Sequence, residues 1–237
     1  MIFFFIFISL ICVSVFIYLE VSKKYLGAII FKALASFSFI LLFFSTFYYY
    51  ITLPVYNIGA IEDLHYFIFV GLGLVLGIIG DLILALRPLA DKSKEDKIIL
   101  AGTISFFIGH LFYVSGIIFL SKVYVQAIIF AFIISLIVWL ISKLMKINWR
   151  RLFVPSILYT FLIFFLVGET IFSVSDLHNS NFSIILIVGS ILFAFSDLIL
   201  SQTYFNHKNS KGYIISNLSM YYLAQIAFAL SWILFVL

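Results

Sequence analysis

The stretch GIIGDLIL (Gly77–Leu84) places one carboxylate close to the end of a long apolar run. A second stretch, FSDLIL (Phe195–Leu200), repeats the pattern downstream, and in both copies Leu-Ile-Leu follows the aspartate. In both copies a glycine also lies eight residues before the aspartate. An ionisable side chain within an apolar run is energetically expensive and usually marks a functional site. The matched aspartates, Asp81 and Asp197, are therefore the first candidates for function.

The composition around these stretches indicates an integral membrane protein. Of the 237 residues, 65% are hydrophobic and only 10% are charged, whereas soluble domains average about 45–50% and about 25%. A spanning helix needs about 20 residues, so the chain has room for about eight helices joined by short loops. Apolar runs of about 20 residues without strict alternation favour helices over membrane strands. The one cysteine, Cys12, has no second cysteine with which to form a disulfide.

Eight apolar runs are predicted to form an all-α bundle of eight transmembrane helices in a single domain, residues 1–237. They cover residues 1–19, 26–48, 66–86, 98–120, 123–142, 152–172, 182–203 and 213–237. The first run has an alternative interpretation as a signal peptide. However, no basic segment precedes it, and Glu20 and Lys23-Lys24 follow it in place of a small-residue cleavage site. We therefore expect the first run to be a retained span.

The distribution of basic residues predicts the orientation of the helices. Apart from Lys32 and Lys122, the Lys and Arg residues lie in or beside the first, third, fifth and seventh connections. They are Lys23, Lys24, Arg87, Lys92, Lys94, Lys97, Lys143, Lys146, Arg150, Arg151, Lys208 and Lys211. Basic residues accumulate in cytoplasmic loops, so we expect these connections to be cytoplasmic and both termini to face outward. The cell membrane is the expected location, which is the inner membrane in a bacterium. The net charge of +4 is then explained by basic residues that orient the helices in the membrane and contact anionic lipid headgroups. No nucleic-acid partner is expected.

An internal repeat is predicted from the spacing of the motifs. The two aspartates are 116 residues apart, and the later motifs Phe-x3-His110 and Tyr-x3-Gln225 are 115 residues apart. The third and seventh spans run in the same direction in the predicted topology. We therefore expect two four-helix halves, about 1–121 and 122–237, related by an axis along the membrane normal. The alternative is that two glycine-spaced helices simply pack alike.

Counting residues from the ends of the runs places several polar side chains at similar depth in the cytoplasmic half of the bundle. These are Lys32, Asp81, Tyr159, Asp197 and Tyr221. His110 and Gln225 lie further toward the midplane, where they are expected to form the floor of a site. Glu169 lies near the outer end of its run and is interpreted as a residue of the membrane interface.

Structural interpretations stand beside the functional ones. Lys32 is close enough to the end of its run to extend to the interface, or it pairs with Asp81 or Asp197. Either aspartate can hold helices together through an ion pair, although such a role seldom needs two matched carboxylates. His110 can be a simple interhelical hydrogen-bonding group. Single tyrosines carry little information, because the chain has 14 of them.

The residue types narrow the chemistry. Two carboxylates in a partly desolvated site can hold different protonation states, one acting as an acid and the other as a base. Such a pair suits cleavage of an ether- or acetal-like bond through an oxocarbenium ion, and it also suits a proton relay in a transporter. The sequence has neither Cys/His clusters nor an H-E-x-x-H motif, so no metal is expected. Without a G-x-S-x-G, P-loop or dinucleotide fingerprint, neither an elbow serine hydrolase nor a cofactor is expected.

The order of these residues resembles the YhhN family of lysoplasmalogenase-like membrane proteins. The resemblance covers nearly the whole chain, including its length and the pattern of eight spans. It rests on Lys32, Gly80-Asp81, Phe106-x3-His110-x2-Tyr113, Tyr159, Ser196-Asp197 and Tyr221-x3-Gln225. Ala33 is a departure, because the family usually has proline after the lysine. Members of the family are multi-span enzymes. They cleave the vinyl ether bond of lysoplasmalogens to a fatty aldehyde and glycerophosphoethanolamine or glycerophosphocholine.

The resemblance implies that Asp81 and Asp197 hydrolyse the vinyl ether bond of a lysolipid within the bilayer. One aspartate protonates the vinyl carbon, and the other stabilises the oxocarbenium ion and orients water. Lys32 and the basic loop residues are expected to hold the phosphate. The expected supporting residues of the pocket are His110, Tyr159, Tyr221 and Gln225. The alternative functions are a small proton-coupled transporter that uses the same aspartates, and a structural or scaffold protein.

Overall fold

The computed structural model describes residues 1–52, 61–177, 179–206 and 210–236. Across these residues the chain contains eight long helices and no strand. The long helices are α1 (Ile2–Val21), α2 (Tyr25–Ile51), α3 (Ile61–Ala85), α4 (Glu95–Leu120), α5 (Val125–Leu144), α6 (Phe153–Phe172), α7 (Ser180–Phe205) and α8 (Lys211–Val236). The connections contain the 3-10 helices η1 (Arg87–Leu89), η2 (Lys92–Lys94), η3 (Arg150–Leu152) and η4 (Ser173–Ser175). All eight long helices are long and apolar enough to cross a membrane, which confirms the predicted number of spans.

The largest boundary difference is at the start of α3, and α2 and α4 differ by less. α2 continues to Ile51, past its predicted end at residue 48, and α3 begins at Ile61 rather than at residue 66. Polar side chains at the end of an apolar run do not end the helix. They extend into the membrane interface while the backbone hydrogen bonds of the helix continue. Lys208, one of the basic residues of the predicted seventh connection, lies outside the described part of the chain.

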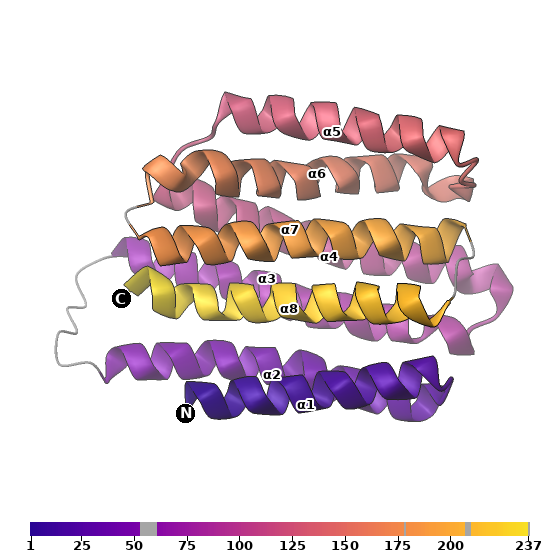
Figure 1. Cartoon of the computed structure of the whole chain (residues 1–237), viewed down its shortest axis with the longest axis horizontal. Coiled ribbons are helices and arrows are strands. Elements are labelled where there is room, and N and C mark those ends of the chain that lie inside the picture. Colours follow the sequence, from indigo (N-terminus) through magenta and orange to yellow (C-terminus); the bar gives the residue numbers. More distant parts are fainter. Residues whose placement is uncertain (53–60, 178, 207–209, 237) are drawn as a thin grey trace.

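Consecutive helices pack as antiparallel pairs: α1 with α2, α3 with α4, α5 with α6, and α7 with α8 (Figure 1). α8 lies at the centre of the bundle, where it contacts α1, α2 and α3 as well as α7. α5 lies at one edge and packs mainly on α6. Residues of α2, α3, α7 and α8 can therefore meet in one interior.

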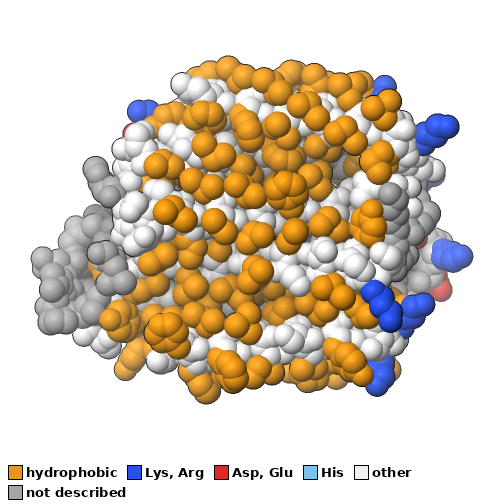
Figure 2. Space-filling model, in the orientation of Figure 1, with side chains coloured by type: hydrophobic (Ala, Val, Ile, Leu, Met, Phe, Trp, Pro, Cys, Tyr) orange, Lys and Arg blue, Asp and Glu red, His pale blue; other side chains and the backbone are white. Residues whose placement is uncertain are grey.

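The two ends of the bundle differ in charge. Both termini lie at one end (Figure 1), and the connections that follow α1, α3, α5 and α7 lie at the other. Most of the Lys and Arg side chains visible in Figure 2 gather at that second end, which we call the basic end. Hydrophobic side chains cover the flank between the two ends (Figure 2). The molecule thus has the surface of a membrane-spanning bundle.

Glycines on α3 allow side chains of α4 and α8 to approach the α3 backbone closely. A Cβ atom added at Gly80 would lie 2.6 Å from the Phe106 ring of α4. A Cβ atom added at Gly77 would lie 2.7 Å from Nε2 of Gln225 on α8. Small residues permit such close helix contacts within membranes. The two glycines therefore bring an aromatic ring and an amide next to the turn of α3 that carries Asp81.

The prediction that Glu169 is a residue of the membrane interface is wrong. The side chain is fully buried, and its Oε1 accepts a hydrogen bond of 3.0 Å from the backbone N–H of Tyr124. Tyr124 immediately precedes α5. Glu169 occupies the last turn of α6, where an interface position is usual, but the start of α5 covers it. The carboxylate anchors the start of α5 to the end of α6.

Candidate active site

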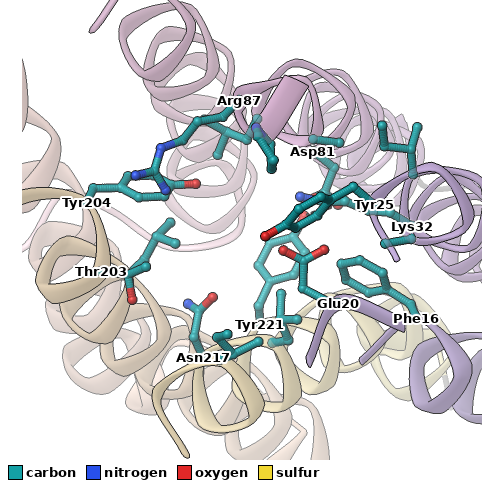
Figure 3. A pocket seen from close by; sticks show the side chains of 18 of the residues that line it. Phe16, Glu20, Tyr25, Lys32, Asp81, Arg87, Thr203, Tyr204, Asn217 and Tyr221 are labelled. Atoms are coloured by element: carbon teal, nitrogen blue, oxygen red, sulfur yellow. Dashed lines mark hydrogen bonds and ion pairs between the residues drawn. The ribbon is translucent and has the colours of Figure 1, made fainter. Parts of the chain in front are cut away.

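A cavity of about 790 Å³ lies inside the bundle and opens at its basic end (Figure 3). This volume is within the range of ligand-binding pockets, about 300–1,000 Å³. Residues of the connections line the mouth, and residues from within the helices line the deeper part. Four of the seven predicted site residues line the cavity: Lys32, Asp81, Asp197 and Tyr221. Depth counting from the sequence therefore selected residues that the fold brings into one space.

Asp81 is the most heavily bonded carboxylate of this cavity. Its Oδ2 accepts hydrogen bonds from the Ser36 hydroxyl at 2.6 Å and the Tyr221 hydroxyl at 2.8 Å. Its Oδ1 lies 3.4 Å from Nζ of Lys32. Because the side chain is only 4% exposed, these partners replace nearly all of its contact with water. Burial opposes the ionised carboxylate, whereas the two hydroxyl donors and the adjacent ammonium stabilise it.

Lys32 points into the cavity rather than to the membrane surface, and its side chain is 12% exposed. The ammonium pairs with Asp81 and also lies 5.8 Å from the centre of the Phe16 ring on α1. The structure thus selects ion pairing over the alternative in which the side chain extends to the interface. A buried ion pair is far less costly than either charge alone.

A row of hydrogen bonds connects Asp81 to the middle of the bundle. Tyr113 donates to Oε1 of Gln225 at 2.9 Å, and Nε2 of Gln225 donates to the Tyr221 hydroxyl at 3.0 Å. Tyr221 in turn donates to Asp81. The Tyr221 hydroxyl both accepts a hydrogen bond and donates one in this row, which holds it in one orientation. Gln225 therefore supports the site from behind Tyr221.

Asp197 has a different environment from Asp81. Its Oδ2 accepts a hydrogen bond of 2.5 Å from the Tyr159 hydroxyl, and within the described chain no ion pair involves it. A second cavity of about 80 Å³ lies among α4, α5, α6 and α7, and both Asp197 and Tyr159 line it. Asp197 therefore borders both the main cavity and a smaller, mostly apolar one.

A family model described as the YhhN family matches residues 27–232. The chain belongs to the YhhN family. The comparisons with curated proteins and with solved structures gave no match. All seven predicted site residues of this YhhN protein lie within the matched part, whereas α1 precedes it.

His110 is packed behind the cavities of the YhhN protein and lines neither of them. Its Nδ1 lies 2.7 Å from the backbone oxygen of Phe106, and its ring stands edge-on to Phe193 with the ring centres 4.4 Å apart. Ring-edge contacts to Tyr113 and Tyr159 surround it further. The predicted floor role is therefore replaced by a position that supports the aromatic rings around Tyr159.

The fold adds residues to the site that sequence reasoning did not select. Ser36 bonds Asp81 and lies 3.3 Å from the Tyr222 hydroxyl. Asn217 donates to the backbone oxygen and the hydroxyl of Ser196, next to Asp197. Ser36 lies one helical turn after Lys32, and Asn217 one turn before Tyr221. This i, i+4 spacing was the available signal, because such residues share one helix face.

Among the residues that the structure describes, no group of three or more His, Cys, Asp or Glu side chains is placed to hold a metal ion. In the main cavity, Lys32 and the hydroxyls of Ser36 and Tyr221 already occupy the oxygens of Asp81. These oxygens are therefore engaged by groups of the protein itself.

Proposed function

We propose that this YhhN protein is a membrane-embedded hydrolase that cleaves the vinyl ether bond of a lysoplasmalogen-type lysolipid. The observation that carries the proposal is that two carboxylates of opposite character line one cavity. Asp81 has a cation and two hydroxyl donors, whereas Asp197 has one tyrosine. Such a division of environments assigns one carboxylate as base and the other as acid.

In the proposed reaction Asp197 is the acid. It donates its proton to the vinyl carbon that is not bonded to oxygen, and the adjacent carbon and the ether oxygen then share a positive charge. The ionised Asp81 stabilises this oxocarbenium ion and takes a proton from the water that attacks the carbon. In the hemiacetal, the bond between the carbon and the glycerol oxygen breaks, and the proton of the new hydroxyl passes through water to the glycerol oxygen, which leaves the fatty aldehyde and the glycerol hydroxyl. The proton that Asp81 took from water passes through water in the cavity to Asp197, which restores both carboxylates.

The cavity also suggests how the lipid lies. The basic residues of the mouth contact the phosphate, and the alkenyl chain lies among apolar side chains toward the bilayer. Because Lys32 is engaged by Asp81, we assign phosphate binding to the mouth, and Lys32 keeps Asp81 ionised. Tyr159 orients Asp197, and Tyr221 with Gln225 orients Asp81. Anionic headgroups of the surrounding membrane contact the basic loops.

The proposal is tested by incubating the purified protein with a lysoplasmalogen and measuring the released fatty aldehyde by mass spectrometry. We expect stoichiometric aldehyde and glycerophospho-alcohol, and no cleavage of the lysolipid whose ether bond is saturated. The saturated lipid is the control because it cannot form an oxocarbenium ion by protonation of carbon. Lipid uptake driven by a pH gradient, without aldehyde, would instead favour the transporter.

The orientation and the repeat are part of the proposal. We place the basic end in the cytoplasm and both termini outside, in the cell membrane, following the positive-inside rule. The two halves, 1–121 and 122–237, are proposed to be duplicated units. Their support is that Gly73 of α3 lies against Tyr113 of α4, while Gly189 of α7 lies against residues of α8.

Labelling of single cysteines tests the orientation. In a Cys12→Ser background, Ser93→Cys in η2 and Ser175→Cys in η4 form a matched pair of exposed positions at opposite ends of the bundle. We expect a membrane-impermeant maleimide to label Ser175→Cys in intact cells, and Ser93→Cys only after permeabilisation. The reverse pattern would invert the proposed topology.

A further inference from the structure

The charged side chains around the cavity mouth divide into paired and unpaired groups. Arg87 pairs with Glu95 at 2.7 Å, and its guanidinium lies 4.3 Å from the centre of the Tyr204 ring. Deeper in the cavity, Lys32 pairs with Asp81. Four other charged residues line the mouth, and within the described chain no ion pair involves them: Glu20, Lys23, Lys92 and Lys211. The mouth thus presents one carboxylate and three ammonium groups to a ligand.

Glu20 is unusual in its place on α1. It lies in the last turn of the helix, where no basic residue accompanies it. The carbonyl groups at a helix C-terminus carry partial negative charge, so a cation is favoured there and an anion is not. Figure 3 shows the Glu20 carboxylate directed into the cavity. The C-terminal end of α1 and the Glu20 carboxylate together form a negatively charged site. The last turn of α1 supplies no cation to balance it.

The wall around Glu20 suits an organic ammonium group. Tyr25 lines the same part of the cavity (Figure 3), and aromatic rings attract ammonium groups. Phe16 also lies there, with its ring centre 5.8 Å from the Lys32 ammonium. The three lysines of the mouth have the opposite charge and suit a phosphate. Lys32 and Arg87 interact electrostatically with Glu20, but each of them already has a carboxylate as its ion-pair partner. A ligand that carries only a phosphate would bring no cation to Glu20. A zwitterion that carries both charges matches both halves of the mouth.

We propose that Glu20 binds the ammonium group of a zwitterionic lysolipid headgroup whose phosphate contacts the lysines of the mouth. This assignment rests on the proposed function, because a lysolipid whose ether bond reaches Asp197 places its headgroup in the mouth. α1 lies outside the segment 27–232 that matches the family. Headgroup selection is therefore supplied by a helix other than those that carry the two aspartates.

The test measures binding without catalysis. The probes are two saturated 1-O-alkyl lysolipids of equal chain length, one with a phosphoethanolamine and one with a phosphate headgroup, which cannot be cleaved as vinyl ethers. Dissociation constants are measured for the purified full-length protein and for Glu20→Gln. We expect Glu20→Gln to weaken binding of the phosphoethanolamine lipid about tenfold, the effect of one charge-assisted contact, and to leave or improve binding of the phosphate lipid.

Glu95→Gln is the matched control, because it removes a carboxylate of the same mouth that is engaged by Arg87. We expect it to change the binding of both lipids by the same factor. Equal weakening of both lipids by Glu20→Gln, or no weakening of the phosphoethanolamine lipid, would overturn the assignment. Because these probes are not substrates, the result is separate from the aldehyde assay, whose failure would reject the proposed hydrolysis alone.

Discussion

Replacement of Asp197 by asparagine is expected to lower kcat for aldehyde release by about a thousandfold. Removal of a positioned acid typically costs a factor of about 10²–10⁴. Asparagine has nearly the shape of aspartate and still accepts the 2.5 Å hydrogen bond from Tyr159. It has no proton to give to the vinyl carbon. The loss is therefore expected in the chemical step, measured as single-turnover aldehyde formation, with lysolipid binding little changed.

Asp176→Asn is the matched control for this experiment. Asp176 is the partner of Lys122 at the opposite end of the bundle, 3.6 Å from its ammonium, and it lines neither described cavity. We expect its variant to release aldehyde at nearly the rate of the unaltered protein. A rate within threefold for a folded Asp197→Asn variant would exclude Asp197 as the acid. Tyr159→Phe should give a smaller loss, since the proton donor remains.

The second large effect is expected at the Lys32–Asp81 pair. Asp81→Asn leaves the Lys32 ammonium buried without a counter-charge, and breaking a buried pair on one side typically costs about 3–5 kcal/mol. We expect a marked fall in thermal stability in detergent together with loss of aldehyde release. The double variant Lys32→Met with Asp81→Asn removes both charges and should recover most of the stability. It should recover none of the activity.

The decisive result is whether the double variant recovers thermal stability without recovering aldehyde release. A double variant no more stable than Asp81→Asn would show that the ammonium is not the source of the instability. Lys122→Met is the comparison at an exposed pair, where the lysine is 66% exposed and little change in stability is expected. Aldehyde release by the double variant would remove Asp81 from the reaction.

The number of spans was predictable because each helix must place about 20 apolar residues in lipid, and runs of this length are visible in the sequence. Depth along each helix was also predictable, so Lys32, Asp81, Asp197 and Tyr221 were selected together. Rotation about the helix axis was not predictable, because it depends on packing against neighbours. His110 therefore lies in the expected helix, but its side chain lies behind the cavities among aromatic rings.

Residues near helix ends were the harder case. Glu20 follows the first apolar run and carries no signal beyond polarity, yet the fold turns it into the cavity mouth. Glu169 has the same kind of position and is instead fully buried under the start of α5. A polar side chain at a helix end near the membrane surface can be exposed to water or buried inside the protein. Which of the two occurs depends on whether the neighbouring connecting segment covers it.

The pairing of Lys32 with Asp81 also bears on how the protein is made. The two charges lie on α2 and α3, which are consecutive in the chain. On insertion scales a single such residue at the centre of a helix costs about 2.5–3.5 kcal/mol. If α2 and α3 leave the insertion machinery together as a hairpin, the ammonium and the carboxylate neutralise each other before either meets lipid alone. The ion pair thus couples the energetic cost of inserting α2 to that of inserting α3.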